Sequence, residues 1–199
     1  MGQETPVDYQ YLLFYKPYNV LSQFTPGSSG SGGLTLGDFI AVAGVYPVGR
    51  LDQDSEGLML LTNDGRVQHR LSHPRYGHSR TYWVQVEGIP SSQALAELRQ
   101  GVRIKDYQTR PCQVALGPTD PPLPPRVPPI RYRQHIPTTW LTITLQEGKN
   151  RQVRRMTAAV GYPTLRLVRQ AIAGLTLDQL CPGDWRYLTA RERARIQKL

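Results

Sequence analysis

Three carboxylates stand at alternating positions in a short polar segment between an arginine and an apolar run. They are Asp52, Asp54 and Glu56, which follow Arg50 in the sequence GRLDQDSEGLMLLTNDG. The apolar letters LMLL predict that a buried strand follows the acids. Because loops at the edges of buried strands commonly carry catalytic side chains, this segment is the first candidate for a functional site.

Three interpretations compete for the acidic segment. Its start matches a calcium loop, with Gly57 at the glycine position, but Leu60 fills a ligand position and Asn63 replaces the bidentate glutamate. The flanks also look like strands rather than helices, which argues against calcium. Paired carboxylates suit glycoside hydrolysis, where one acid protonates the leaving group and another attacks or activates water. A solvated acidic turn capped by Ser55 and Asn63 is the third interpretation.

A second concentration of charge lies in the segment EGKNRQVRRM. Its apolar residues recur at helical spacing, so a helix capped by Asn150 can pack one face and present arginines on another. Arginine suits bidentate contacts with phosphate or carboxylate. A solvated basic face is the alternative, since most runs of charge are of that kind. The cations are Lys149, Arg151, Arg154 and Arg155.

The overall charge favours a polyanionic partner. The chain has 24 Lys and Arg against 15 Asp and Glu, a formal charge of +9 and a pI of about 9.8. Such a balance suggests nucleic acid, although excess charge also aids solubility. The two cysteines form no disulfide framework, the N-terminus has no secretory pattern, and no apolar run is long enough to span a bilayer. We expect a cytoplasmic protein without membrane contact.

Hydrophobic periodicity and turn residues predict a mixture of strands and helices. We expect a mobile Gly/Ser loop at 27–33 and a proline-rich excursion at 118–137. Strands are predicted at 11–15, 45–49, 58–62, 80–87, 102–104, 112–116, 139–145, 165–172 and 185–188. Helices are predicted at 35–41, 65–71, 91–100, 150–160 and in the basic C-terminal tail.

Three histidines need a separate explanation. His69 and His73 stand four residues apart, a spacing that can present a metal on a helix, and His78 is near. No glutamate follows His69, and Pro74 ends the helix. We therefore expect turn and surface roles for these side chains and no metal.

Five segments together resemble a known family. They are Lys16 with Pro17, the acidic segment, RTYWVQVEG, EGKNRQVRRM and LRLVRQAIAGLTL. This order resembles that of RNA pseudouridine synthases of the small-subunit-type branch, and the resemblance extends over residues 11–188. The seventeen-residue acidic segment is far more specific than a short motif.

The resemblance implies a fold and a function. The fold would be α+β, with a mixed, mostly antiparallel bent sheet, flanking helices and a central active-site cleft. Residues 1–199 would form a single catalytic domain of two lobes, without a separate N-terminal RNA-binding domain. The activity would be site-specific isomerisation of uridine to pseudouridine in large-subunit ribosomal RNA, without cofactor or metal, by a monomer. A non-catalytic RNA-binding or ribosome-assembly protein and a glycosidase remain the rival functions.

The resemblance also assigns roles to residues. Asp52, after Arg-Leu, would be the catalytic aspartate, while Asp54 and Glu56 would shape or solubilise the turn. Arg154 would pair with Asp52 and keep it ionised. Tyr82 would stack on the uracil and help to move its proton, and Leu167 would be an apolar pocket residue.

RNA contacts would surround this centre. A uridine in folded RNA must leave its stack to reach a pocket, and Arg50 is the expected residue to occupy the vacated space or hold a phosphate. Backbone phosphates would be bound by Lys16, Lys149, Arg151 and Arg155.

Overall fold

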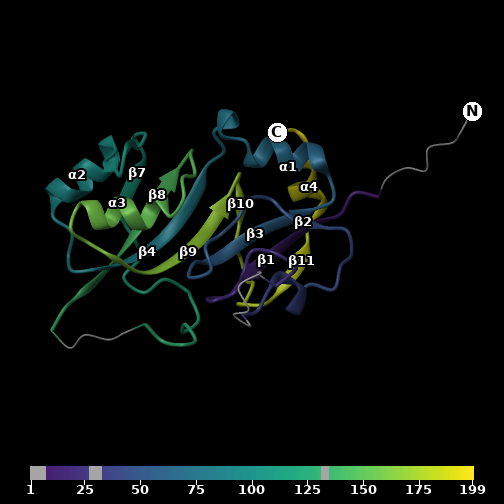
Figure 1. The fold of residues 1–199 in the computed structure, drawn as a ribbon, viewed down its shortest axis with the longest axis horizontal. Coiled ribbons are helices and arrows are strands. Elements are labelled where there is room, and N and C mark those ends of the chain that lie inside the picture. Colours follow the sequence, from purple (N-terminus) through teal and green to yellow (C-terminus); the bar gives the residue numbers. More distant parts are fainter. Residues whose placement is uncertain (1–7, 27–32, 131–134) are drawn as a thin grey trace, which may run out of the picture.

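One long mixed sheet runs through the molecule (Figure 1). The computed structural model describes residues 8–26, 33–130 and 135–199. Within these residues the main sheet has nine strands in the order β11-β1-β3-β9-β4-β8-β7, with β10 paired to β9 and β2 paired to β3. Its strands are β1 (Tyr11–Lys16), β2 (Tyr46–Pro47), β3 (Glu56–Thr62), β4 (Arg80–Glu87), β7 (Gln113–Leu116), β8 (Thr138–Leu145), β9 (Thr164–Ile172), β10 (Leu175–Thr176) and β11 (Trp185–Tyr187).

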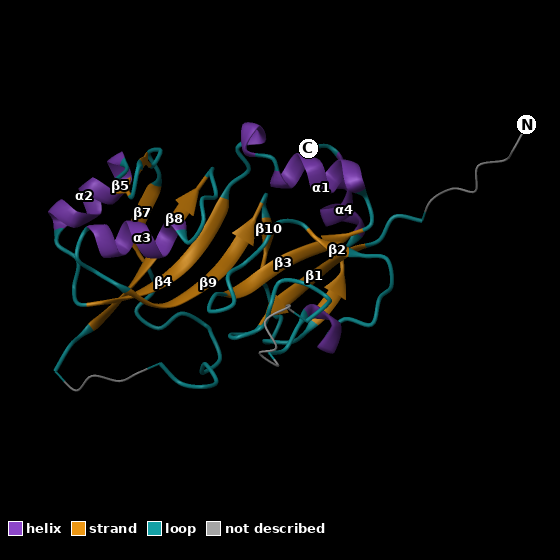
Figure 2. Ribbon diagram, viewed as in Figure 1, coloured by secondary structure: helices purple, strands orange, loops and turns teal. Residues whose placement is uncertain are grey.

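Helices flank this sheet (Figure 2). They are α1 (Gly65–Ser72), α2 (Ser92–Gln100), α3 (Gln152–Ala159), α4 (Ala190–Gln197) and the 3-10 turns η1 (Leu36–Asp38) and η2 (Pro74–Tyr76). A small separate ribbon contains β5 (Arg103–Ile104) and β6 (Tyr107–Gln108). Only β3 and β9 pair in parallel among the strands of the described main sheet. The α+β, mostly antiparallel architecture is therefore confirmed.

The half of the sheet that contains β1 and β3 is buried on both faces. On one face Leu13 and Leu60 pack with α1 and α4, and on the other Leu12 and Leu61 pack with the η1 region. This double burial explains why the apolar run in β3 is continuous rather than alternating. The other half, from β4 to β7, packs against α2 and α3.

Helix boundaries follow local capping chemistry. The Asp64 carboxylate accepts hydrogen bonds from the backbone amides of Arg66 and Val67 and so begins α1. Ser91 caps α2, and Gly101 ends it at a positive φ of 94°, at the position where the sequence predicts the end. The cap predicted at Asn150 is wrong, because the N-cap of α3 is Arg151, in the left-handed region at φ 52°.

Two predicted elements are much shorter in the structure. The helix expected at 35–41 is only the three-residue η1, and the strand expected at 45–49 is only the two-residue β2. Gly44 and Gly49 adopt positive φ at both ends of that strand, which limits its length. Its apolar residues Val45 and Val48 are nevertheless buried. The apolar pattern therefore indicated correctly which residues are buried, but not how long the strand is.

The proline-rich excursion contains no helix or strand over residues 118–130. It is anchored to the sheet, because Arg166 donates to the Pro124 carbonyl at 3.0 Å and the Arg126 guanidinium lies 4.2 Å from the centre of the Tyr18 ring. Part of the excursion and the greater part of the predicted 27–33 loop lie outside the described residues. No described helix has the length and apolar character that a membrane crossing requires.

The two halves of the sheet meet where β3 crosses β9. Glu56 and Gly57 pair with Val168 and Arg169 across the parallel contact. A Cβ at Gly57 would lie 2.4 Å from the carbonyl oxygen and 2.6 Å from the nitrogen of Arg169, and Gly57 has a φ of 106°. Only glycine permits this approach.

We predict that Gly57→Ala lowers the free energy of unfolding by roughly 2 to 4 kcal/mol, because the added methyl group clashes with the backbone of Arg169, which is fixed in the sheet. Gly44→Ala is the matched control, since Gly44 also has positive φ but an added Cβ would meet nothing within 4 Å. It should cost about 1 kcal/mol. Urea unfolding of both variants measures the difference, and equal losses would contradict the close approach.

The C-terminal helix gives a pH prediction. Hydrogen bonds from Arg186, both 2.8 Å, lower the pKa of Glu192 from 4.5 to about 2. This carboxylate therefore stabilises the fold fully above pH 4.5, and the contribution is lost as the pH falls through about 2. Glu192→Gln should lower stability at pH 7 by roughly 1 to 3 kcal/mol, and the difference should shrink below pH 4.5. Urea unfolding at pH 7 and pH 3 tests this; a constant difference would refute it.

Candidate active site

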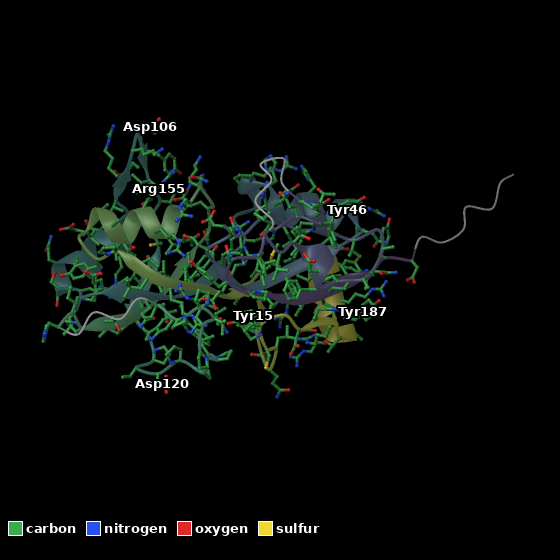
Figure 3. All side chains as sticks on the ribbon, turned by 60° about the horizontal axis from the view of Figure 1, so that its bottom comes forward. Tyr15, Tyr46, Asp106, Asp120, Arg155 and Tyr187 are labelled. Atoms are coloured by element: carbon green, nitrogen blue, oxygen red, sulfur yellow. The ribbon has the colours of Figure 1, made fainter. Side chains whose placement is uncertain are left out.

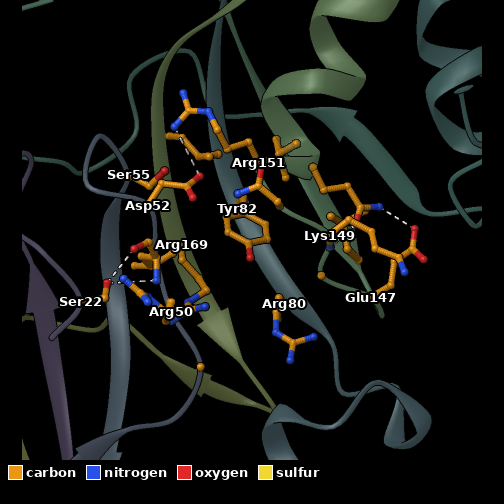
Figure 4. A pocket seen from close by; sticks show the side chains of 18 of the residues that line it. Ser22, Arg50, Asp52, Ser55, Arg80, Tyr82, Glu147, Lys149, Arg151 and Arg169 are labelled. Atoms are coloured by element: carbon orange, nitrogen blue, oxygen red, sulfur yellow. Dashed lines mark hydrogen bonds and ion pairs between the residues drawn. The ribbon is translucent and has the colours of Figure 1, made fainter. Parts of the chain in front are cut away.

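A cavity of about 670 Å³ lies between the two halves of the sheet, lined by residues from both (Figure 4). This volume is in the range of small-molecule sites. The loop before β3 supplies Asp52, β4 supplies Tyr82, β9 supplies Leu167, and the loop before α3 supplies a set of basic residues. The predicted central cleft is therefore present.

The structure brings most of the predicted site residues together. Three of the nine, Lys16, Arg154 and Arg155, are absent from the cavity lining. The six that line it are Arg50, Asp52, Tyr82, Lys149, Arg151 and Leu167.

The loop that carries Asp52 is held by buried hydrogen bonds. The Ser22 hydroxyl donates to the Leu51 carbonyl at 2.7 Å and accepts from the Leu51 amide at 3.1 Å. The Ser55 amide donates to the Asp52 carbonyl at 3.0 Å. The Asp52 carboxylate stays 30% exposed, and its ion pair with Arg151 is long, at 3.8 Å. Asp52 is therefore fixed through its backbone while its carboxylate remains accessible.

Asp54, rather than Asp52, is the main partner of the arginines. Arg151 contacts both Asp54 oxygens, at 2.8 and 2.7 Å. Arg154 donates to the Asp54 carbonyl at 2.6 Å and lies 3.4 Å from its carboxylate. Burial alone would raise the pKa of Asp54, but these two guanidiniums outweigh it and lower the pKa.

The predicted pairing of Arg154 with Asp52 is therefore wrong in this structure. The α3 helix directs Arg154 to the turn two residues beyond Asp52, and Arg151 takes the position beside both acids. Sequence order could not distinguish these arrangements, because both arginines lie within one helical turn.

Glu56 also differs from its predicted role. Its side chain is 3% exposed and forms a bidentate ion pair with Arg166, with distances of 2.9 and 2.8 Å. It begins β3 rather than belonging to a solvated turn. This buried pair lies beside the β3–β9 contact.

Lys16 does not support the prediction of a phosphate contact. It is fully buried at the end of β1, and its ammonium donates to the carbonyls of Pro17, Val20 and Gln53. Burial lowers its pKa from 10.5 to about 7. The structure therefore gives Lys16 the role of joining β1 to the loop after Asp52, through the hydrogen bond to the Gln53 carbonyl.

The basic loop before α3 is positioned by Glu147. This carboxylate accepts hydrogen bonds from Tyr107 at 2.6 Å and Gln152 at 2.5 Å, and the Gln152 side chain accepts from the Lys149 amide at 2.9 Å. The Lys149 ammonium lies 4.4 Å from the centre of the Tyr107 ring. Arg155 lies outside the cavity, on an outer surface shared with Asp106 (Figure 3).

The sequence analysis did not assign several polar residues of the cavity lining to the site, among them Ser22, Ser55, Arg80 and Arg169. Arg80 donates to the Leu71 carbonyl at 3.0 Å. Arg169 is 2% exposed and donates to the Leu58 carbonyl at 2.7 Å, while its Nη2 has no hydrogen-bond partner. A charged residue within the apolar strand LRLVRQAI was a signal of this site, since buried charges are rare without a partner or function.

The histidines lie apart from this cavity. The rings of His69 and His73 are 5.2 Å apart, and Tyr76 stacks on His78. In the part of the chain that is described, no group of three or more His, Cys, Asp or Glu side chains could hold a metal ion.

Comparisons with known proteins agree with this geometry. Residues 10–159 match the family model described as RNA pseudouridylate synthase. The chain is 56% identical over 178 residues to ribosomal large subunit pseudouridine synthase E of Vibrio vulnificus, covering 89% of this chain and 74% of the relative. It is 54% identical over 171 residues to the protein of the same name from Xanthomonas axonopodis, covering 86% and 90%.

Solved structures show the same fold. One described as a crystal structure of pseudouridylate synthase superposes with a TM-score of 0.77 at 25% identity, covering 95% of this chain and 74% of that chain. A chain of a structure described as an H/ACA RNP bound to a substrate RNA containing 2′-deoxyuridine has a TM-score of 0.55 at 12% identity, covering 85% of this chain and 49% of that chain. The second likeness concerns the fold alone.

The two neighbouring aspartates should have different effects on stability. Asp54→Asn leaves Arg154 without its carboxylate partner and should lower the free energy of unfolding by about 1 to 3 kcal/mol. Asp52→Asn removes only a long, partly exposed ion pair and should cost less than about 1 kcal/mol. Thermal unfolding of both variants tests the assignment, which fails if Asp52→Asn is as destabilising as Asp54→Asn.

Proposed function

The chain belongs to the RNA pseudouridine synthase family, and we propose that it isomerises uridine to pseudouridine at a specific position of large-subunit ribosomal RNA. The observation that carries this proposal is the accessible Asp52 carboxylate in a cavity shared with Tyr82 and Leu167. Relatives at 52 to 56% identity are named ribosomal large subunit pseudouridine synthase E, which supports the choice of RNA.

The reaction rearranges one nucleotide without loss of atoms. The C1′–N1 bond breaks and its electron pair stays on the uracil. The base turns, its C5 bonds to C1′, the proton on C5 is released, and N1 takes a proton. Asp52 acts at the ribose as a nucleophile or as a base, because its carboxylate is the one that faces the cavity with only a distant arginine.

The walls of the cavity suit a flat base. Tyr82 and Leu167 come from the adjacent strands β4 and β9, with Leu167 opposite Val84. An aromatic ring and an aliphatic side chain can hold uracil between them. Arg50 is exposed, and its hydrogen bond to Gln23 is long, at 3.4 Å, so it is free to enter the space that the flipped uridine leaves.

The phosphates of the RNA would lie along the basic side of the cavity. Lys149 and Arg151 line it, Arg80 adds a third cation, and Arg155 extends the positive surface outward. This set replaces Lys16, which is buried. Affinity should therefore fall as salt rises. The proposed enzyme acts in the cytoplasm as a monomer and uses no cofactor or metal.

We predict that Asp52→Asn lowers the rate of isomerisation on the order of a thousandfold or more, because the group that acts at the ribose is lost. Release of tritium from RNA labelled at uracil C5 measures the reaction. Fluorescence anisotropy measures RNA binding, which should stay within a few fold. Equal losses of binding and activity would count against a catalytic Asp52.

The same assay separates the rival functions. A non-catalytic RNA-binding protein would bind the RNA and release no tritium. A glycosidase would set free the uracil base without rejoining it. Mapping of pseudouridine in ribosomal RNA from cells that lack the protein identifies the target nucleotide.

A further inference from the structure

One buried guanidinium has no carboxylate partner. Arg169 is 2% exposed, and no described carboxylate forms an ion pair with it. Its Nε donates to the Leu58 carbonyl, and its Nη2 has no hydrogen-bond partner. Arg166, three residues earlier on the same strand, has a bidentate partner in Glu56. Tyr82 also interacts with this guanidinium through a side-chain hydrogen bond, so Nη2 is the one donor that still needs an explanation beyond the fold.

Arg169 belongs to the floor of the cavity. It lies two residues after Leu167 on β9, and thus on the same face of the sheet, and its Cα partner on β4 is Tyr82. Facing side chains of paired strands are in contact range. In the close-up, Asp52, Tyr82 and Arg169 lie around one hollow (Figure 4). A base placed against Tyr82 and Leu167 would therefore lie within reach of Arg169.

The cavity contains a second unused donor. Ser55 is 1% exposed, and its hydroxyl has no hydrogen-bond partner. Burial of an unpaired polar group is unfavourable, and arginine cannot relieve the cost by losing its proton. Two such groups in one cavity wall indicate a ligand that brings hydrogen-bond acceptors.

The location selects the kind of acceptor. The exposed cations of the cavity lining, Arg50, Lys149 and Arg151, lie in loops, where they can meet phosphates. Arg169 lies instead on the sheet, between an aromatic and an aliphatic side chain. The part of a nucleotide that fits there is the base, and the acceptors of uracil are its two carbonyl oxygens.

We propose that Arg169 is a further catalytic residue, which donates from its free Nη2 to a carbonyl oxygen of the uracil and stabilises the negative charge of the detached base. This inference rests on the proposed function. When the C1′–N1 bond breaks, its electron pair leaves with the base, and the charge spreads from N1 onto the carbonyl oxygens. A fixed cation in a site without bulk water stabilises such charge more than it stabilises neutral uridine.

The test varies the base as well as the protein. Arg169→Gln should slow single-turnover reaction of a uridine substrate about 100-fold or more. With 5-fluorouridine at the target position of the same RNA, the decrease in rate caused by Arg169→Gln should be at least about tenfold smaller. Fluorine withdraws electrons and therefore stabilises the base anion without Arg169. Mass spectrometry of the digested RNA measures consumption of either nucleoside.

Arg80→Gln is the matched control, since Arg80 also lines the cavity but its guanidinium donates to the carbonyls of Leu71 and His78. Its loss should slow both substrates by the same factor. If Arg169→Gln does not fold, Arg169→Lys keeps the charge while its shorter head group withdraws from the base. Arg169→Lys should also slow the reaction of uridine more than that of 5-fluorouridine.

The outcomes separate this inference from the function on which it rests. If the unaltered protein releases no tritium from uridine RNA, the proposed function fails. If it is active but the Arg169 variants slow both bases equally, the function stands and Arg169 is only structural.

Discussion

The close approach of β3 to β9 is the contact on which the rest of the structure depends. It joins the two halves of the sheet through the parallel pairing of Gly57 with Arg169. The absence of a side chain at Gly57 lets the two backbones meet, and the buried pair of Glu56 with Arg166 lies beside them. Asp52 is in the loop that leads into this crossing, so the position of the carboxylate is set by backbone packing rather than by its own contacts.

The arginines near the crossing are divided between two uses. Arg166 and Arg154 are matched with Glu56 and Asp54, and these pairs satisfy buried charge. Asp52 is left with a single long ion pair, which does not enclose its carboxylate. A carboxylate held as tightly as Asp54 would have to lose strong hydrogen bonds before it could react. Because Asp54 takes the close contacts of the arginines, the Asp52 carboxylate remains accessible for reaction.

Periodicity predicted the long elements well, because β3 and α2 combine apolar patterns with clear end signals such as Gly101. It could not reveal tertiary choices. Lys16 looked like a surface cation, but its ammonium is buried against two nearby carbonyls and the carbonyl of Gln53, which is 37 residues away in the sequence. Arg154 and Arg151 were interchangeable in sequence, and only the direction of α3 decides which one reaches Asp52. Arg169 was not selected from the sequence, because only the fold shows that it is buried and lies opposite Tyr82.

The order of strands has a consequence for how the chain folds. β1, near the start, lies between β3 and β11, and β11 is formed by Trp185–Tyr187 near the end. β9 joins the halves only after more than a hundred intervening residues. Closing such long loops is entropically costly and slows folding. During synthesis, the basic residues before α3 can therefore be exposed before β11 completes the half of the sheet that contains β1. The cavity around Asp52 forms only when β9 has paired with β3, so the chain can catalyse a reaction only late in folding.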